Sequence, residues 1–117
     1  MENEVKMQHQ FVELHCCGQD LRLAYDFNEI CDAERACGCN LLAALESLKG
    51  LGAAQLRGLL YAALRPAHPI VTLQEVGTLI RVDTVLPITE AMAHAYQLAL
   101  ENPTEPDSEE NSAVPTE

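Results

Sequence analysis

The sequence predicts an α+β fold that is mainly helical, with about five short helices and an N-terminal β-hairpin. Two stretches near the N-terminus alternate apolar and polar residues, as strands with one buried face do. Further along, apolar residues recur at helical spacing between capping residues and chain breakers. Hydrophobic residues make up 48% of the 117-residue chain, with no Trp and only two Phe. We therefore expect a core of Leu, Ile, Val and Ala.

The chain is long enough for one domain, and its two ends differ from the middle in composition. Residues 1–10 are polar and are expected to be flexible. Residues 11–101 are predicted to form a single helical domain with its hairpin. Residues 102–117 are rich in Pro, Ser, Glu, Asn and Thr and cannot bury enough apolar surface to offset the entropy of ordering. We therefore expect a disordered acidic tail.

The hairpin is predicted from the alternating segments 11–15 and 21–25. Gly18, in the five-residue connection between them, can adopt the positive φ that a tight turn needs. Two strands alone are marginally stable in water, so we expect the hairpin to lie against the helices.

A first helix is predicted to begin after Asp26, run to about Ala36 and end at Gly38, because Asp is a favourable N-cap and Gly a helix breaker. A second short helix is expected over residues 41–48, with Asn40 as its cap. The residues expected on the inward faces of these two helices are Phe27, Ile30, Cys31, Leu41, Leu45 and Leu48.

A third helix is predicted over residues 53–65, where Pro66 and Pro69 forbid its continuation. Its apolar stripe consists of Leu56, Leu59, Leu60, Ala63 and Leu64.

The last two helices are predicted from a capping box and a proline. Thr72 and Glu75 have the spacing of reciprocal side-chain caps at the start of a helix over residues 72–82. Pro87 suits the first turn of a helix that ends near Glu101. The residues expected to face inward are Leu73, Val76, Leu79, Ile80, Ile88, Ala91, Met92, Ala95 and Ala99.

The charge of the chain argues against nucleic acid as a partner. The formal net charge is −11, and residues 101–117 contain six acidic residues and no basic one. Residues 72–100 have the outline of a helix-turn-helix, but the second helix carries Glu90 and Glu101 and no Lys or Arg. It therefore lacks the usual donors to phosphates and base edges. A basic or largely apolar partner fits better.

The sequence predicts neither export nor a membrane span. No apolar run approaches the length that a bilayer requires, and the acidic N-terminus has no apolar signal region. A reducing cytoplasm is the simplest setting for the five cysteines, which we expect to be free thiols. These are Cys16, Cys17, Cys31, Cys37 and Cys39.

The sequence predicts no enzyme, metal site or cofactor site. Adjacent Cys16 and Cys17 and the Cys37-x-Cys39 pair lack the spacing of recognised zinc modules, which place two or more residues between paired cysteines. There is no Cys-x-x-Cys, and Gly50-Leu51-Gly52 lacks the third glycine of a dinucleotide fingerprint. His68, between two prolines, is expected either to contact a partner or, preferably, to cap the third helix with its ring.

Two stretches carry a resemblance to a known family. The first is Leu56-Arg57-x-Leu59-Leu60-x-Ala62-Ala63-Leu64 followed by His68-Pro69, and the second is Thr72-x-x-Glu75-Val76-Gly77-x-Leu79-Ile80. With Tyr25-Asp26-Phe27-Asn28-Glu29-Ile30-Cys31 and Glu34 before them, they resemble the tail assembly chaperones of long-tailed bacteriophages. The branch that includes the gene transfer agent tail chaperones is the most similar. The resemblance covers about residues 20 to 98.

The resemblance implies a non-enzymatic protein of a phage or prophage that works in the cytoplasm of the host bacterium. It implies binding to the tape measure protein and recruitment of tail tube subunits, without a place in the mature virion. A helix-in-groove contact suits such a partner. The apolar residues expected to remain for the partner after core packing are Leu51, Leu60, Tyr61, Val71, Val85 and Leu86.

The main alternative is a small bacterial or phage adaptor or regulatory protein that binds another protein through its last two helices. A DNA-binding regulator ranks third. The sequence leaves the oligomeric state open.

Overall fold

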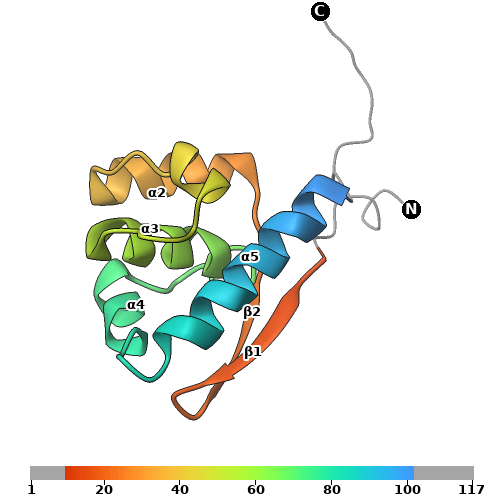
Figure 1. The fold of residues 1–117 in the computed structure, drawn as a ribbon, viewed down its shortest axis with the longest axis vertical. Helices are drawn as coiled ribbons and strands as arrows, with labels where there is room; N and C mark the ends of the chain where they lie inside the picture. Colours follow the sequence, from red (N-terminus) through yellow and green to blue (C-terminus); the bar gives the residue numbers. More distant parts are fainter. Residues whose placement is uncertain (1–9, 102–117) are drawn as a thin grey trace, which may run out of the picture.

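The computed structural model describes residues 10–101 and shows a mainly helical α+β fold (Figure 1). Within these residues, a two-stranded antiparallel hairpin precedes four helices and one 3-10 turn. The elements are β1 (Val12–Cys16), β2 (Gln19–Leu23), α2 (Phe27–Cys37), η1 (Ala43–Glu46), α3 (Ala53–Leu64), α4 (Leu73–Leu79) and α5 (Val85–Glu101). Apart from Gln10, the predicted flexible N-terminus and acidic tail lie outside the described residues.

The predicted hairpin is present, but its connection is shorter than expected. Only Cys17 and Gly18 form the turn, with φ angles of 55° and 74°. Two successive residues with positive φ make the primed type of turn whose twist matches that of paired strands. A cysteine is an uncommon residue in this conformation, so a turn as tight as this could not be expected from the residue types alone. The register pairs Val12 with Leu23, Leu14 with Leu21 and Cys16 with Gln19.

Helix α2 begins and ends as predicted. The Asp26 carboxylate accepts hydrogen bonds from the backbone N–H groups of Asn28 at 2.8 Å and Glu29 at 3.3 Å, and Gly38 ends the helix with a φ of 71°. The prediction that Phe27 faces inward is wrong, because 64% of its surface is exposed. The buried face of α2 is instead formed by Ile30 and Ala33.

The predicted second helix over residues 41–48 is wrong. Only the 3-10 turn η1 forms there, and the side chain of Asn40 does not cap it. Instead, the Glu34 carboxylate of α2 accepts hydrogen bonds from the backbone N–H groups of Leu41 at 2.8 Å and Leu42 at 3.1 Å. These two bonds, that of Leu42 first, lower the pKa of Glu34 below its usual value.

Helix α3 is the centre of the fold and contacts α2, α4, α5 and β2 (Figure 1). All five residues of its predicted stripe are buried, and Gly58 and Ala62 are buried as well. The helix is therefore covered around most of its circumference rather than along one stripe. Tyr25 fixes the chain before α2 to this centre, since its buried hydroxyl donates to the Leu59 carbonyl at 3.0 Å.

The capping box at α4 is confirmed, but the helix ends earlier than predicted. The Glu75 backbone N–H donates to the Thr72 hydroxyl at 3.1 Å, and the Thr72 backbone N–H donates to the Glu75 carboxylate at 3.0 Å. The helix ends at Leu79, since the backbone of Ile80 is extended. Val82, the residue at which the helix was predicted to end, is 99% exposed.

Helix α5 begins at Val85, two residues before Pro87, and packs across the hairpin (Figure 1). Its predicted inward face is buried at Ile88, Ala91, Met92 and Ala95 and half-buried at Ala99. None of the helices within residues 10–101 is long and apolar enough to cross a bilayer.

Candidate interaction groove

An apolar groove of about 730 Å³ lies between the chain around η1 and helix α5. We call it the η1–α5 groove. Its apolar lining comes from Leu45, Leu48, Leu51 and Leu56 on one side and from Val85, Leu86, Ala93 and Tyr96 on the other.

The packing of α5 explains why this surface stays open. Because Ile88, Met92 and Ala95 face the core, residues on the side and on the opposite face of the helix stay outside it. Among these, Val85 is 37% and Leu86 is 65% exposed. Apolar side chains gathered along a concave surface indicate a binding site more strongly than scattered exposed ones do.

The polar rim of the η1–α5 groove is weakly acidic. Glu46 and Glu90 contribute two carboxylates and Lys49 one ammonium group, and Thr89 and Gln97 are uncharged. The whole described part of the chain, residues 10–101, is also acidic, with eleven Asp and Glu against six Lys and Arg. The groove thus combines an apolar floor with a surrounding field that favours basic groups.

The structure brings three of the six predicted partner-binding residues together. Leu51, Val85 and Leu86 all line the η1–α5 groove, although Leu51 is more than thirty residues from the other two. Leu48 and Tyr96 join them and were not predicted as contacts. For α5 a signal existed, since Leu86, Ala93 and Gln97 recur at helical spacing on the face opposite the predicted core.

The other three predicted residues lie elsewhere. Leu60 has no exposed surface and belongs to the core, so its assignment to partner binding is corrected. Tyr61 is half-buried, and its hydroxyl accepts a hydrogen bond from the Arg65 guanidinium at 3.1 Å. Val71 lines a separate, smaller pocket of about 270 Å³ with His68.

The expected role of the His68 ring as a cap of the third helix is wrong. Its Nε2 accepts the backbone N–H of Arg22 at 3.2 Å and so joins the loop after α3 to strand β2. The carbonyl of Leu64 at the end of α3 is satisfied by the backbone N–H of His68 at 2.7 Å. The His68 imidazole therefore stabilises the fold through a hydrogen bond that could not be predicted from the sequence spacing.

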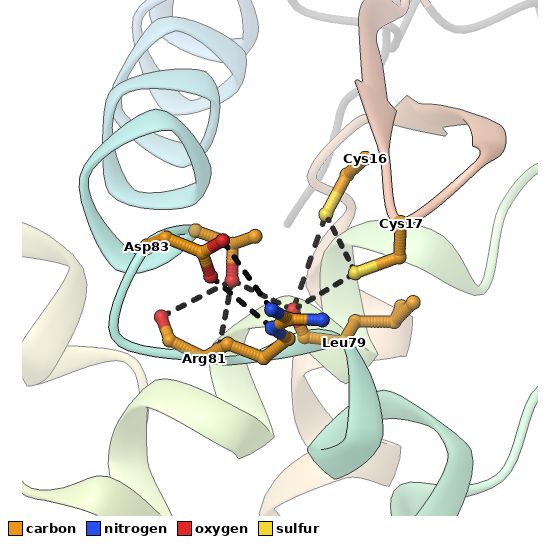
Figure 2. Close-up of polar contacts among 6 residues, drawn as sticks. Cys16, Cys17, Leu79, Arg81 and Asp83 are labelled. Atoms are coloured by element: carbon orange, nitrogen blue, oxygen red, sulfur yellow. Dashed lines mark hydrogen bonds and ion pairs between the residues drawn. The ribbon is translucent and has the colours of Figure 1, made fainter.

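Apart from the groove, a cluster of thiols and charged side chains lies where the hairpin turn meets the end of α4 (Figure 2). The sulfurs of Cys16 and Cys17 are 3.5 Å apart, and they approach the Leu79 carbonyl oxygen at 3.9 and 3.7 Å. Burial, reinforced by the contact with Cys17, raises the pKa of the Cys16 thiol to about 11. Beside them, the Arg81 guanidinium pairs with the Asp83 carboxylate at 3.1 Å.

All five cysteines are free thiols, as predicted. Within residues 10–101, no three side chains of His, Cys, Asp or Glu form a group arranged to hold a metal ion.

Comparisons of the chain with protein-family models, with curated proteins and with solved structures find no match.

Proposed function

We propose that this protein is a tail assembly chaperone of a long-tailed bacteriophage, acting without enzymatic activity in the host cytoplasm. Its main client would be the tape measure protein, and it would help to recruit tail tube subunits without staying in the mature virion. The observation that carries the proposal is the η1–α5 groove with its exposed Val85 and Leu86.

The apolar lining of the groove suits one face of an amphipathic helix. Such a helix presents anchors at i, i+3, i+4 and i+7, and a long apolar groove can receive several of them at once. A tape measure protein consists largely of long helices with apolar stripes, which need cover before the tube assembles around them. The groove would shield such a stripe.

One residue of the stretches that carry the family resemblance, Leu56 of α3, lines this groove. The acidic rim, with Glu46 and Glu90, favours a client helix whose apolar stripe is flanked by Lys or Arg.

The direct test is co-purification of the full chain with fragments of the tape measure protein encoded beside it, followed by affinity measurement. We expect Leu86→Glu to weaken binding by about 10-fold or more, because it places a charge in the apolar contact. Leu100→Glu is the matched control. Leu100 is a similarly exposed leucine of the same helix, at 60% against 65%, and does not line the groove. This control should bind within about twofold of the wild type.

Two results would contradict the proposal. One is failure of the wild-type chain to bind any tape measure fragment, which would favour an adaptor with another partner. The other is a genome in which no tube protein gene precedes, and no very long tape measure gene follows, the gene for this chain.

A further inference from the structure

Strand β1 lies at the margin of the described fold and forms the open edge of the hairpin (Figure 1). Because Cys16 and Gln19 flank a two-residue turn, they are a hydrogen-bonded pair, and every second pair after them is one too. The backbone groups of Glu13 and His15 therefore point away from β2. Within residues 10–101, these outward N–H and C=O groups have no hydrogen-bond partner.

The corresponding edge of β2 is covered by the helical part of the fold. The outward N–H of Arg22 donates to His68 Nε2 at 3.2 Å, and the N–H of Ala24, just after the strand, donates to the Ala63 carbonyl of α3 at 3.0 Å. Of the two strands, β1 is therefore the one that can accept a further strand.

We propose that β1 pairs with β1 of a second copy of this chain, so that two hairpins form one antiparallel sheet. With Leu14 opposite Leu14 of the second copy, Glu13 lies opposite His15 on both sides of the two-fold axis. The outward groups of these residues then exchange four backbone hydrogen bonds. Such a contact uses the same surface on both chains and closes as a dimer.

The charged side chains of β1 are complementary to each other in this register. Glu13 and His15 extend from the exposed face of the hairpin, and the Glu13 carboxylate has no ion-pair or hydrogen-bond partner among residues 10–101. Nδ1 of the His15 ring lies 2.7 Å from Asp20 Oδ1, which leaves Nε2 for the Glu13 carboxylate of the second copy. A protonated ring would thus bridge two carboxylates across three strands.

The opposite face of β1 favours the same register. Val12 and Cys16 are buried there, whereas Leu14 between them is only half-buried, so apolar surface remains at the centre of the edge. Leu14 of the second copy would cover this surface. A shift of the register by two residues would place Glu13 opposite Glu13, or His15 opposite His15, and so set like groups against each other.

This pairing does not rest on the proposed function, because no residue of β1 lines the η1–α5 groove. Self-association through β1 and client binding in the groove can therefore be disrupted separately by mutation.

The test is sedimentation velocity of the full-length chain, kept reduced, over a range of concentrations. We expect a monomer–dimer equilibrium. Glu13→Pro removes an outward N–H without removing a bond to β2, whereas Glu13→Ala keeps this N–H. Because each dimer would lose two hydrogen bonds, the proline variant should dimerise about 10-fold or more weakly than the alanine variant.

Charge variants test the register. Glu13→Lys removes the attraction to His15 of the second copy and should weaken dimerisation by about fivefold or more, whereas His15→Lys keeps opposite charges and should dimerise at least as tightly as the wild type. The matched control is Glu46→Lys, the same change at an exposed residue outside the hairpin, which should stay within about twofold of the wild type. Circular dichroism checks that each variant folds.

Hydrogen exchange gives an independent readout, since the amide protons of Glu13 and His15 should exchange more slowly as the concentration rises. A chain that stays monomeric at every concentration would overturn the inference. So would a dimer that Glu13→Pro leaves intact, or one that Leu86→Glu disrupts instead, because the second copy would then occupy the groove.

Discussion

Glu34 shows how one side chain can set the path of a neighbouring segment. It belongs to α2, yet its carboxylate accepts the backbone N–H groups of Leu41 and Leu42, which would otherwise lack partners at the start of the η1 segment. The hydrogen bond from Leu41 holds this buried residue at its place in the core. A loop residue therefore depends on a helix residue seven positions earlier.

We predict that Glu34→Gln destabilises the fold, and that the destabilisation depends on pH. The two N–H donors keep the pKa of Glu34 below its usual value, so the ionised carboxylate stabilises the folded state. This contribution is complete above the ordinary pKa of a glutamate and is lost as the pH falls through the lowered one. Chemical denaturation at pH 7 and pH 3 measures it.

The matched control for this prediction is Glu46→Gln, since Glu46 lies on the exposed side of η1 and makes no such bond. A constant stability difference between wild type and Glu34→Gln across this pH range would show that the carboxylate charge does not matter.

Single residues also mark the boundary between what local sequence predicts and what it does not. Asp26 and Thr72 were correctly predicted as caps, because their bonds reach only two or three residues along the chain. Asn40 was a plausible cap by the same reasoning. That prediction is wrong because the backbone N–H groups of the two residues that follow Asn40 bond to the Glu34 carboxylate of α2.

Among the elements, α2 and α3 pack on each other, and Gly58 of α3 faces Cys37 at the end of α2. A Cβ atom at this position would lie 2.9 Å from the Cys37 sulfur and 3.1 Å from the nearer methyl group of Leu41. Both distances are shorter than side chains tolerate without movement. Glycine is thus used here, inside a helix, for close packing and not for an unusual backbone conformation.

We predict that Gly58→Ala destabilises the fold by about 1 kcal/mol. The variant gains about 1 kcal/mol of helix propensity but overpacks the α2–α3 contact, which costs about 1–3 kcal/mol. Equilibrium unfolding in urea measures the difference. In a Cys37→Ala background, the same change should cost less by about 0.5 kcal/mol or more, because the nearest atom is gone.

Gly77→Ala in α4 provides the control, since the nearest atom to an added Cβ there is 3.4 Å away. We expect it to be neutral or to stabilise the fold. An equal cost at positions 58 and 77 would contradict the packing explanation.

At the level of elements, periodicity predicted α3 and α5 well, because each has a long run of apolar residues at helical spacing. The end of α4 was predicted three residues too far. No residue around Val82 forbids a helix. The chain turns there because the Thr84 hydroxyl donates a hydrogen bond to the Leu79 carbonyl oxygen. Such side-chain competition becomes visible only in the structure.

For the molecule as a whole, the candidate binding surface arises from segments that are distant in sequence. Leu51 follows η1, whereas Val85 and Leu86 begin α5, and the fold places them in one groove that Leu56 of α3 also lines. From the sequence, these residues could be identified as apolar and as not needed for the predicted core. They could not be separated from Leu60, because burial all around α3 depends on four neighbouring elements.

We predict that binding of a basic client helix to the groove weakens as salt increases. The net charge of −11 attracts such a client, and the screening length falls from about 10 Å at 0.1 M salt to about 3 Å at 1 M. Affinity titrations over this range measure the effect. The double variant with Glu46→Gln and Glu90→Gln should show a shallower dependence, and binding unaffected by salt would exclude an electrostatic contribution.

The central position of α3 has a consequence for how the domain opens. Because α2, α4, α5 and β2 all pack on this one helix, removal of any of them exposes apolar surface that the others cannot cover. Partial opening is therefore costly, and the domain is expected to melt as one cooperative unit. The amide protons of α3 would then exchange with solvent deuterium only through global unfolding, whereas those at the edge of the fold would exchange through local fraying.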